Sequence, residues 1–139
     1  MYLFAYGTLR FSNSLIKQGI LKDEFEFVGR GKIKAVIYDI GSYPGAVKDN
    51  AGNEVRGEVF RVLEVKRAFD VLDSFENYDR MNERHCEYIR RRVRVRMDSR
   101  DSLMAWVYWY NGDLKAKNRI AQNDYLEYLT IKEEIGHTR

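Results

Sequence analysis

An acidic side chain stands on the apolar stripe of the clearest amphipathic helix in this sequence. At 100° per residue, Val65, Phe69 and Leu72 of the helix predicted over 64–76 share one face. Glu76 lies eleven residues after Val65, and this rotation of about 1100° is roughly 20° past a whole number of turns, so its carboxyl points along the same stripe. Burial there raises a carboxyl pKa toward neutrality, where the group exchanges protons as a general acid or base.

A purely structural role for Glu76 is also open. The helix could end near Ser74 and leave the carboxyl in solvent, because helix ends fray. Alternatively, the carboxyl could form an ion pair with an arginine of the strand predicted over 88–97. The helical pattern alone does not decide between a catalytic and a structural carboxyl.

The first predicted strand, residues 2–6, leads into a glycine turn. The motif at this point is Tyr6, Gly7, Thr8 and Leu9, and its first residue is the last of the strand. Such a turn between strand and helix leaves backbone N–H groups unpaired and aimed at one point. This arrangement suits a carboxylate or a developing oxyanion. An ordinary tight turn explains the same four residues.

Hydrophobic periodicity and turn residues predict many short strands and few helices, which favours one sheet curled into a small barrel. The stretch 41–45 is predicted as a loop, and a hairpin is expected around 49–53. Strands are expected at 2–6, 25–40, 46–47, 55–62, 88–97 and 103–110, and helices at about 12–20, 64–76 and 121–135.

The composition narrows the classes of function. A chain of 139 residues with 45% hydrophobic and 32% charged residues is expected to form a single globular domain over 1–139. The sequence has one cysteine, Cys86, and two histidines, His85 and His137, which argues against a disulfide framework, a zinc cluster and a histidine-centred triad. Since no apolar run is long enough for a membrane span or a signal peptide, we expect a cytoplasmic protein.

Arginines crowd the strand predicted over 88–97. Alternation places Ile89, Arg91, Val93, Val95 and Met97 on the core face and Arg90, Arg92, Arg94 and Arg96 on the other. The run suggests nucleic-acid binding, but a solvated face with neighbouring acids explains it equally well, and the net charge is only +3. Cys86 beside His85 is interpreted as structural, because adjacent strand residues point to opposite faces.

Five short motifs occur in an order and spacing typical of one family. Over residues 2–110 the chain resembles the gamma-glutamylcyclotransferase-like family. The resemblance implies an α+β fold, a small mixed, mostly antiparallel β-barrel flanked by a few helices. It also implies cyclisation of a gamma-glutamyl group to 5-oxoproline with release of the attached amine. The motifs are Tyr6–Leu9, Tyr43–Gly45, Gly57–Phe60, Leu72–Glu76 and Tyr88–Arg90.

The resemblance also assigns roles to residues. Glu76 follows leucine-aspartate-x-aromatic and so matches the family's general acid/base. A glycine often follows that acid, whereas Asn77 does so here. No metal and no organic cofactor are needed. Substrate contacts are expected from Tyr6, Gly7, Thr8, Leu9, Pro44, Gly45, Tyr88 and Tyr108, with Tyr88 and Tyr108 as hydrogen-bond donors from the wall.

The expected partner is a small gamma-glutamyl amine or peptide, without nucleic acid or membrane, and the chain is expected to be a monomer or a homodimer. A non-catalytic small-molecule binding module of the same fold is the alternative, and Asn77 is its main support in the sequence.

Overall fold

The computed structural model describes residues 1–7, 24–41, 43–76 and 78–137. Its elements follow one another as β1 (Tyr2–Ala5), β2 (Phe25–Asp39), β3 (Pro44–Lys48), β4 (Glu54–Val62), α1 (Val65–Phe75), the short 3₁₀ helix η2 (Glu83–His85), β5 (Tyr88–Met97), β6 (Ser102–Tyr110), β7 (Asn118–Arg119) and α2 (Tyr125–His137). The helix predicted over 12–20 lies outside the described residues.

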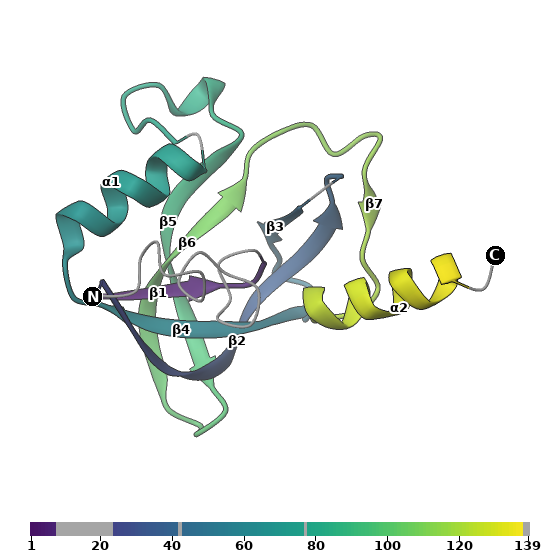
Figure 1. The fold of residues 1–139 in the computed structure, drawn as a ribbon, viewed down its shortest axis with the longest axis horizontal. Helices are drawn as coiled ribbons and strands as arrows, with labels where there is room; N and C mark the ends of the chain where they lie inside the picture. The colour runs from purple at the N-terminus through teal and green to yellow at the C-terminus, as the bar shows by residue number, and fades with distance from the viewer. Residues whose placement is uncertain (8–23, 42, 77, 138–139) are drawn as a thin grey trace.

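Five strands close into a barrel, as expected. Their order is β2–β4–β1–β6–β5, and a second edge of β2 pairs with β5 to complete the ring. β1 and β6 run parallel, whereas the other neighbours are antiparallel. α1 lies on one side of the barrel, and α2 lies at the far end of the sheet, beside β7 (Figure 1).

The barrel closes where β5 approaches a glycine of β2. Gly31 pairs with Met97, and a Cβ at Gly31 would lie 2.7 Å from Val95 Cγ1 and 2.9 Å from the Arg96 carbonyl oxygen. A larger residue there would push the strands apart. β2 is long enough to serve two neighbours: residues 25–34 pair with β4, and residues 35–39 pair with β3.

Two hydrophobic clusters hold these elements together. The barrel interior is built from Phe4, Ile33, Val59, Val95 and Val107 with their neighbours, which are almost completely buried. The second cluster lies under α1, where Leu3, Phe60, Phe69, Leu72 and Tyr108 pack between the helix and the outer face of the barrel.

The structure corrects the predicted loop at 41–45. Pro44 and Gly45 are the first two residues of β3, and both are buried. Proline is tolerated at the first position of a strand because it need not donate a ladder hydrogen bond there. The predicted hairpin is also wrong, because β3 and β4 pair with successive parts of β2 rather than with each other.

The strand β5 departs from the predicted alternation at two residues, Arg91 on the predicted core face and Arg90 on the predicted solvated face. Val95 and Met97 face the core as predicted, but Arg91 is exposed and its guanidinium binds Glu83. Arg90, expected on the solvated face, lies under α1 with 19% of its side chain exposed. The alternation failed because α1 covers this end of the outer face.

The final helix begins later than predicted. It starts at Tyr125 rather than at residue 121, because the Asp124 carboxylate accepts the Leu126 N–H at 2.9 Å and caps the first turn. Tyr125 is buried against the barrel, and Tyr128 and Leu129 pack beside it.

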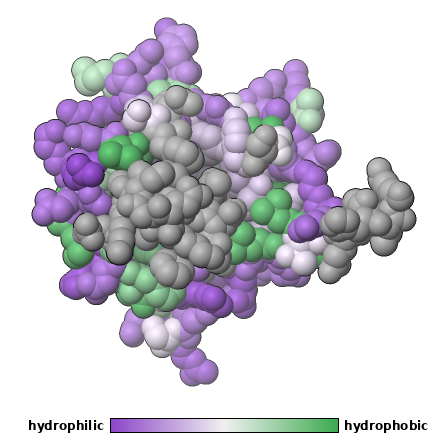
Figure 2. All heavy atoms as spheres, in the orientation of Figure 1, coloured by the Kyte–Doolittle hydropathy of each residue, from purple (hydrophilic) through white to green (hydrophobic). Residues whose placement is uncertain are grey.

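Hydrophilic side chains cover much of the visible surface of the described residues, and green apolar patches are small (Figure 2). This agrees with the charged fraction of 32%. No helix in the described part of the chain is long and apolar enough to cross a bilayer.

A tight contact in β4 gives a test of the barrel packing. A Cβ at Gly57 would lie 2.5 Å from the Ala5 carbonyl oxygen and 2.5 Å from Phe4 Cζ, and the backbone atom cannot yield cheaply. Gly57→Ala should therefore lower the free energy of unfolding by about 1–3 kcal/mol, measured by urea denaturation.

Gly29→Ala is the matched control, because a Cβ at Gly29 meets only the mobile Cε of Met97, at 3.2 Å. The control should stay within about 0.5 kcal/mol of the parent. Equal stability of the two variants would contradict the packing described for β4.

Candidate active site

Glu76 occupies the end of α1 with its side chain on the predicted stripe. The backbone N–H of Glu76 donates to the Leu72 carbonyl at 2.8 Å, so the helical spacing continues one residue beyond Phe75. Phe69 and Leu72 are buried on the same stripe, whereas Val65 in the first turn is 39% exposed. The helix therefore delivers the Glu76 carboxyl, partly buried, to the edge of the cluster beneath it.

The surroundings of Glu76 favour its neutral form. Burial raises the pKa of this carboxyl to about 7, and the negative charge of Glu87 contributes to the rise. The Glu76 charge in turn raises the pKa of four tyrosines, so it lies within electrostatic reach of Tyr6, Tyr43, Tyr88 and Tyr108.

An ion pair between Glu76 and a strand arginine, the structural alternative, is not found among the described residues. The arginines that are paired take other partners: Arg90 lies beside Asp73, Arg91 beside Glu83, and Arg96 beside Glu54. With no cation paired to it in the described ranges, burial raises the Glu76 pKa toward neutral pH, which suits proton transfer.

The start of the glycine turn packs against β3. The Tyr6 hydroxyl donates to the Tyr108 carbonyl at 2.6 Å and accepts from the Ala46 N–H at 3.2 Å. Gly7 is buried, and a Cβ there would lie 2.5 Å from Pro44 Cγ, so the turn requires glycine at this contact. The expected substrate contacts of Thr8 and Leu9 lie outside the described residues, as does Asn77.

Tyr88 and Tyr108 line the site with hydroxyls that already have acceptors. The Tyr88 hydroxyl donates to the Pro44 carbonyl at 2.6 Å, and the Tyr108 hydroxyl donates to Asp73 Oδ1 at 2.6 Å. Because a hydroxyl has one proton, both protons are engaged in this arrangement, and donation to a substrate stays a prediction. Both keep lone pairs that accept hydrogen bonds.

Gly45 lies against Tyr110, which packs on Tyr88. A Cβ at Gly45 would lie 2.7 Å from both Cβ and Cγ of Tyr110. The Tyr110 ring packs edge-on against Tyr88, with centroids 5.5 Å apart. Gly45 therefore lets a tyrosine pair approach β3, and its expected contact with a substrate stays a prediction.

Sequence reasoning missed Glu87 and the role of Tyr43. The Tyr43 hydroxyl donates to Glu87 Oε1 at 2.5 Å, which raises the Tyr43 pKa to about 12. Tyr43 also packs against Tyr88, with ring centroids 6.2 Å apart. Tyr43 carries a signal in the sequence, since it begins one of the family motifs, whereas Glu87 belongs to none of the five motifs.

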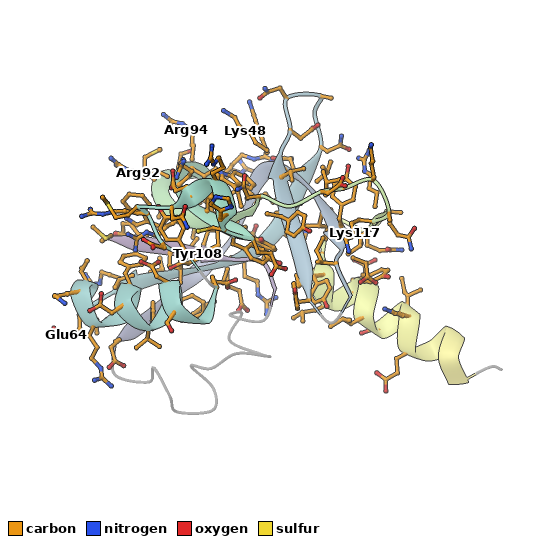
Figure 3. All side chains as sticks on the ribbon, turned by 90° about the horizontal axis from the view of Figure 1, so that it is seen from above. Lys48, Glu64, Arg92, Arg94, Tyr108 and Lys117 are labelled. Atoms are coloured by element: carbon orange, nitrogen blue, oxygen red, sulfur yellow. The ribbon has the colours of Figure 1, made fainter. Side chains whose placement is uncertain are left out.

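The other candidates from the sequence lie away from Glu76 or serve the fold. Arg92 and Arg94 reach outward, whereas Tyr108 lies in the middle of the molecule (Figure 3). Cys86 is buried, its Sγ accepts the Asp79 N–H at 3.2 Å, and the adjacent His85 is exposed. These contacts support the structural interpretation of Cys86.

Comparison with known proteins agrees with the motifs. The sequence model of the family described as "Gamma-glutamyl cyclotransferase, AIG2-like" matches residues 3–127. A protein of Methanocaldococcus jannaschii named "Putative gamma-glutamylcyclotransferase MJ1514" is 31% identical over 114 residues, which cover 78% of this chain and 83% of that protein.

Solved structures share the fold. YkqA from Bacillus subtilis matches with a TM-score of 0.70 and 23% identity over 96% of this chain, which spans only 42% of the YkqA chain. PH0828 from Pyrococcus horikoshii gives 0.65 and 21%, covering 96% of this chain and 97% of its own. An AIG2-like protein from Mus musculus gives 0.60 and 24%, covering 78% of this chain and 75% of its own.

The barrel topology, the motifs in order and the family match over residues 3–127 therefore lead to one conclusion. This chain belongs to the gamma-glutamyl cyclotransferase, AIG2-like family.

Proposed function

We propose that this chain is a gamma-glutamyl cyclotransferase that converts a small gamma-glutamyl amine or peptide to 5-oxoproline and the free amine. The observation that carries the proposal is the carboxyl of Glu76, which is partly buried, has a pKa of about 7 and lacks an ion-pair partner among the described residues. Family membership supports the reaction type.

Glu76 acts as the base and then as the acid. The ammonium form of the substrate, which predominates at neutral pH, first loses a proton to water. The neutral α-amino nitrogen then attacks the γ-carbonyl carbon, and the Glu76 carboxylate accepts a proton from this nitrogen as the new N–C bond forms. The carboxyl returns that proton to the departing nitrogen as the old C–N bond breaks, so one residue balances both steps.

The remaining chemistry needs little from the protein. Nucleophile and electrophile belong to one molecule, and closure of a five-membered ring removes most of the entropic barrier. We assign the turn at 6–9 to the substrate α-carboxylate or to the oxyanion of the tetrahedral intermediate. The tyrosines around Glu76 restrict water there, which keeps the carboxyl pKa high enough for proton exchange.

A panel of gamma-glutamyl amines and dipeptides, screened by mass spectrometry for 5-oxoproline, tests the activity directly. Product from at least one substrate is expected. A panel without product, while ligands still bind, would favour the non-catalytic binding module.

Glu76→Gln should abolish turnover and stabilise the fold. The folded-state pKa of about 7 lies above the ordinary 4.5, so ionising this carboxyl in the folded protein costs on the order of 3 kcal/mol. The cost is absent below the ordinary pKa and complete above about 7. Urea denaturation should therefore show the variant to be more stable than the parent at about pH 8 and nearly equal at about pH 4.

Glu26→Gln is the control, because Glu26 is an exposed acid paired with Arg61 on the barrel surface. It should cyclise substrates at the parental rate. Parental activity in Glu76→Gln would remove Glu76 from the mechanism.

The pH dependence of kcat/KM should report the raised pKa. The base must be ionised, so kcat/KM rises with pH along a limb centred near 7. Glu87→Gln keeps an acceptor for Tyr43 but removes the neighbouring negative charge, so the limb should move to lower pH. Rates measured across the pH range with one substrate check this, and a limb that stays in place would show that the Glu87 charge does not act on the base.

A further inference from the structure

We propose that Tyr108, Asp73 and Arg90 form a positioning network that holds the turn after α1, and with it the carboxyl of Glu76, in the place where it reacts. The kinetic part of this inference rests on the proposed function. None of the three side chains needs to touch the substrate in this role.

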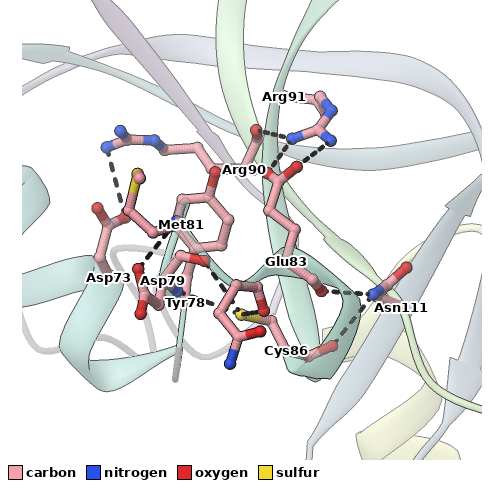
Figure 4. A network of polar contacts seen from close by, with 10 residues as sticks. Asp73, Tyr78, Asp79, Met81, Glu83, Cys86, Arg90, Arg91 and Asn111 are labelled. Carbon is pink, nitrogen blue, oxygen red and sulfur yellow. Dashed lines mark hydrogen bonds and ion pairs between the residues drawn. The ribbon is translucent and has the colours of Figure 1, made fainter.

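The network joins the last turn of α1 to two strands of the barrel. Tyr108 of β6 donates its hydroxyl proton to Asp73 Oδ1 at 2.6 Å, and Nη1 of Arg90, on β5, lies 3.4 Å from the same oxygen. Asp73 precedes Glu76 by three residues, nearly one helical turn. The contact therefore fixes the helix end directly before the proposed catalytic carboxyl. Figure 4 shows the part of the network between Asp73 and Arg90.

Arg90 is built into this position. Its guanidinium carbon lies 4.2 Å from the ring centroid of Phe69 and 5.3 Å from that of Trp106, so it is stacked between helix and strand. Nη1 is buried and has no hydrogen-bond partner among the described residues. The positive charge of Arg90 is balanced mainly by the carboxylate of Asp73. This ion pair fixes the position of the Asp73 carboxylate.

Asp73 also closes the turn through its backbone. Its carbonyl accepts the Tyr78 N–H at 2.7 Å, so the chain returns to Asp73 after passing Glu76. The Tyr78 ring packs edge-on against Tyr108, with centroids 6.5 Å apart. Asp73 thus anchors both ends of the segment that carries Glu76.

Tyr108 connects this anchor to the glycine turn. Its backbone carbonyl accepts the Tyr6 hydroxyl at 2.6 Å, while its own hydroxyl binds Asp73. One residue of β6 therefore sets the distance between the start of the proposed substrate turn and the helix end that carries the base. A hydroxyl committed in this way is better explained by positioning than by donation to a substrate.

The chain contains a matched control elsewhere. The Tyr128 hydroxyl donates to Asp39 Oδ2 at 2.5 Å, and Lys132 Nζ lies 3.0 Å from the same oxygen. This group has the same three chemical types, but it joins α2 to β2, away from Glu76. Tyr128→Phe and Tyr108→Phe each remove one hydroxyl from a tyrosine, carboxylate and cation set.

The experiment measures the pKa of Glu76 by carbon-13 NMR titration of labelled glutamate carboxyls, with the Glu76 signal assigned as the one missing in Glu76→Gln. Tyr108→Phe removes no charge at neutral pH, and Glu87, whose negative charge acts on Glu76, is unchanged in this variant. A change in the titration therefore reports the position and hydration of the carboxyl.

In Tyr108→Phe the Glu76 pKa should fall toward 4.5 by about one unit as water reaches the carboxyl. The value of kcat should fall about tenfold, while KM should change less than about twofold. The reason is that the variant loses the hydrogen bond from Tyr108 to the charged Asp73, which positions Glu76 and does not bind the substrate. Tyr128→Phe should lose comparable stability and leave the pKa and kcat unchanged.

Arg90→Lys provides a second variant with the same net charge, and it should lower the Glu76 pKa in the same direction because lysine cannot reproduce the stacked guanidinium. An unchanged Glu76 titration in both variants would overturn the network. A parent without activity would contradict only the proposed function, because the NMR titration decides the positioning role independently.

Discussion

The site depends on keeping the Glu76 carboxyl partly buried, with no cation paired to it in the part of the chain that the structure describes. Burial raises its pKa to about 7, and the nearby charge of Glu87 acts in the same direction. An arginine in contact would reverse this shift and hold the group ionised. Among the described residues, Arg90, Arg91 and Arg96 of β5 are paired with Asp73, Glu83 and Glu54 rather than with Glu76.

The aromatic residues around Glu76 serve the same constraint. Their hydroxyls form hydrogen bonds between strands. The Tyr6 hydroxyl joins β3 and β6, and the Tyr88 hydroxyl joins β5 to the first residue of β3. Phenol rings are bulky and apolar over most of their surface, so they restrict water, while the hydroxyls of Tyr6 and Tyr88 donate to buried backbone carbonyls. The hydroxyl protons of Tyr6, Tyr88 and Tyr108 are therefore committed within the fold.

Sequence reasoning succeeded where one element decides the outcome and failed where several elements meet. The stripe of α1 placed Glu76 correctly, because helical rotation is a local property. Pro44 and Gly45 looked like loop residues, yet they begin β3, since a proline needs no ladder partner at a strand start and a glycine admits the Tyr110 ring. Arg90 looked solvated, because the alternation of β5 contains no information about the helix that covers it.

By itself the sequence determined the barrel class, the acidic residue at the end of α1 and the order of motifs that marks the family, because periodicity, turn chemistry and motif spacing are written along the chain. Only the tertiary structure decided which groups surround Glu76, which hydroxyls are already committed and which arginine is stacked beneath the helix. Those properties depend on distances between residues far apart in sequence, and burial, which sets the pKa of the carboxyl, exists only once the strands and α1 have packed.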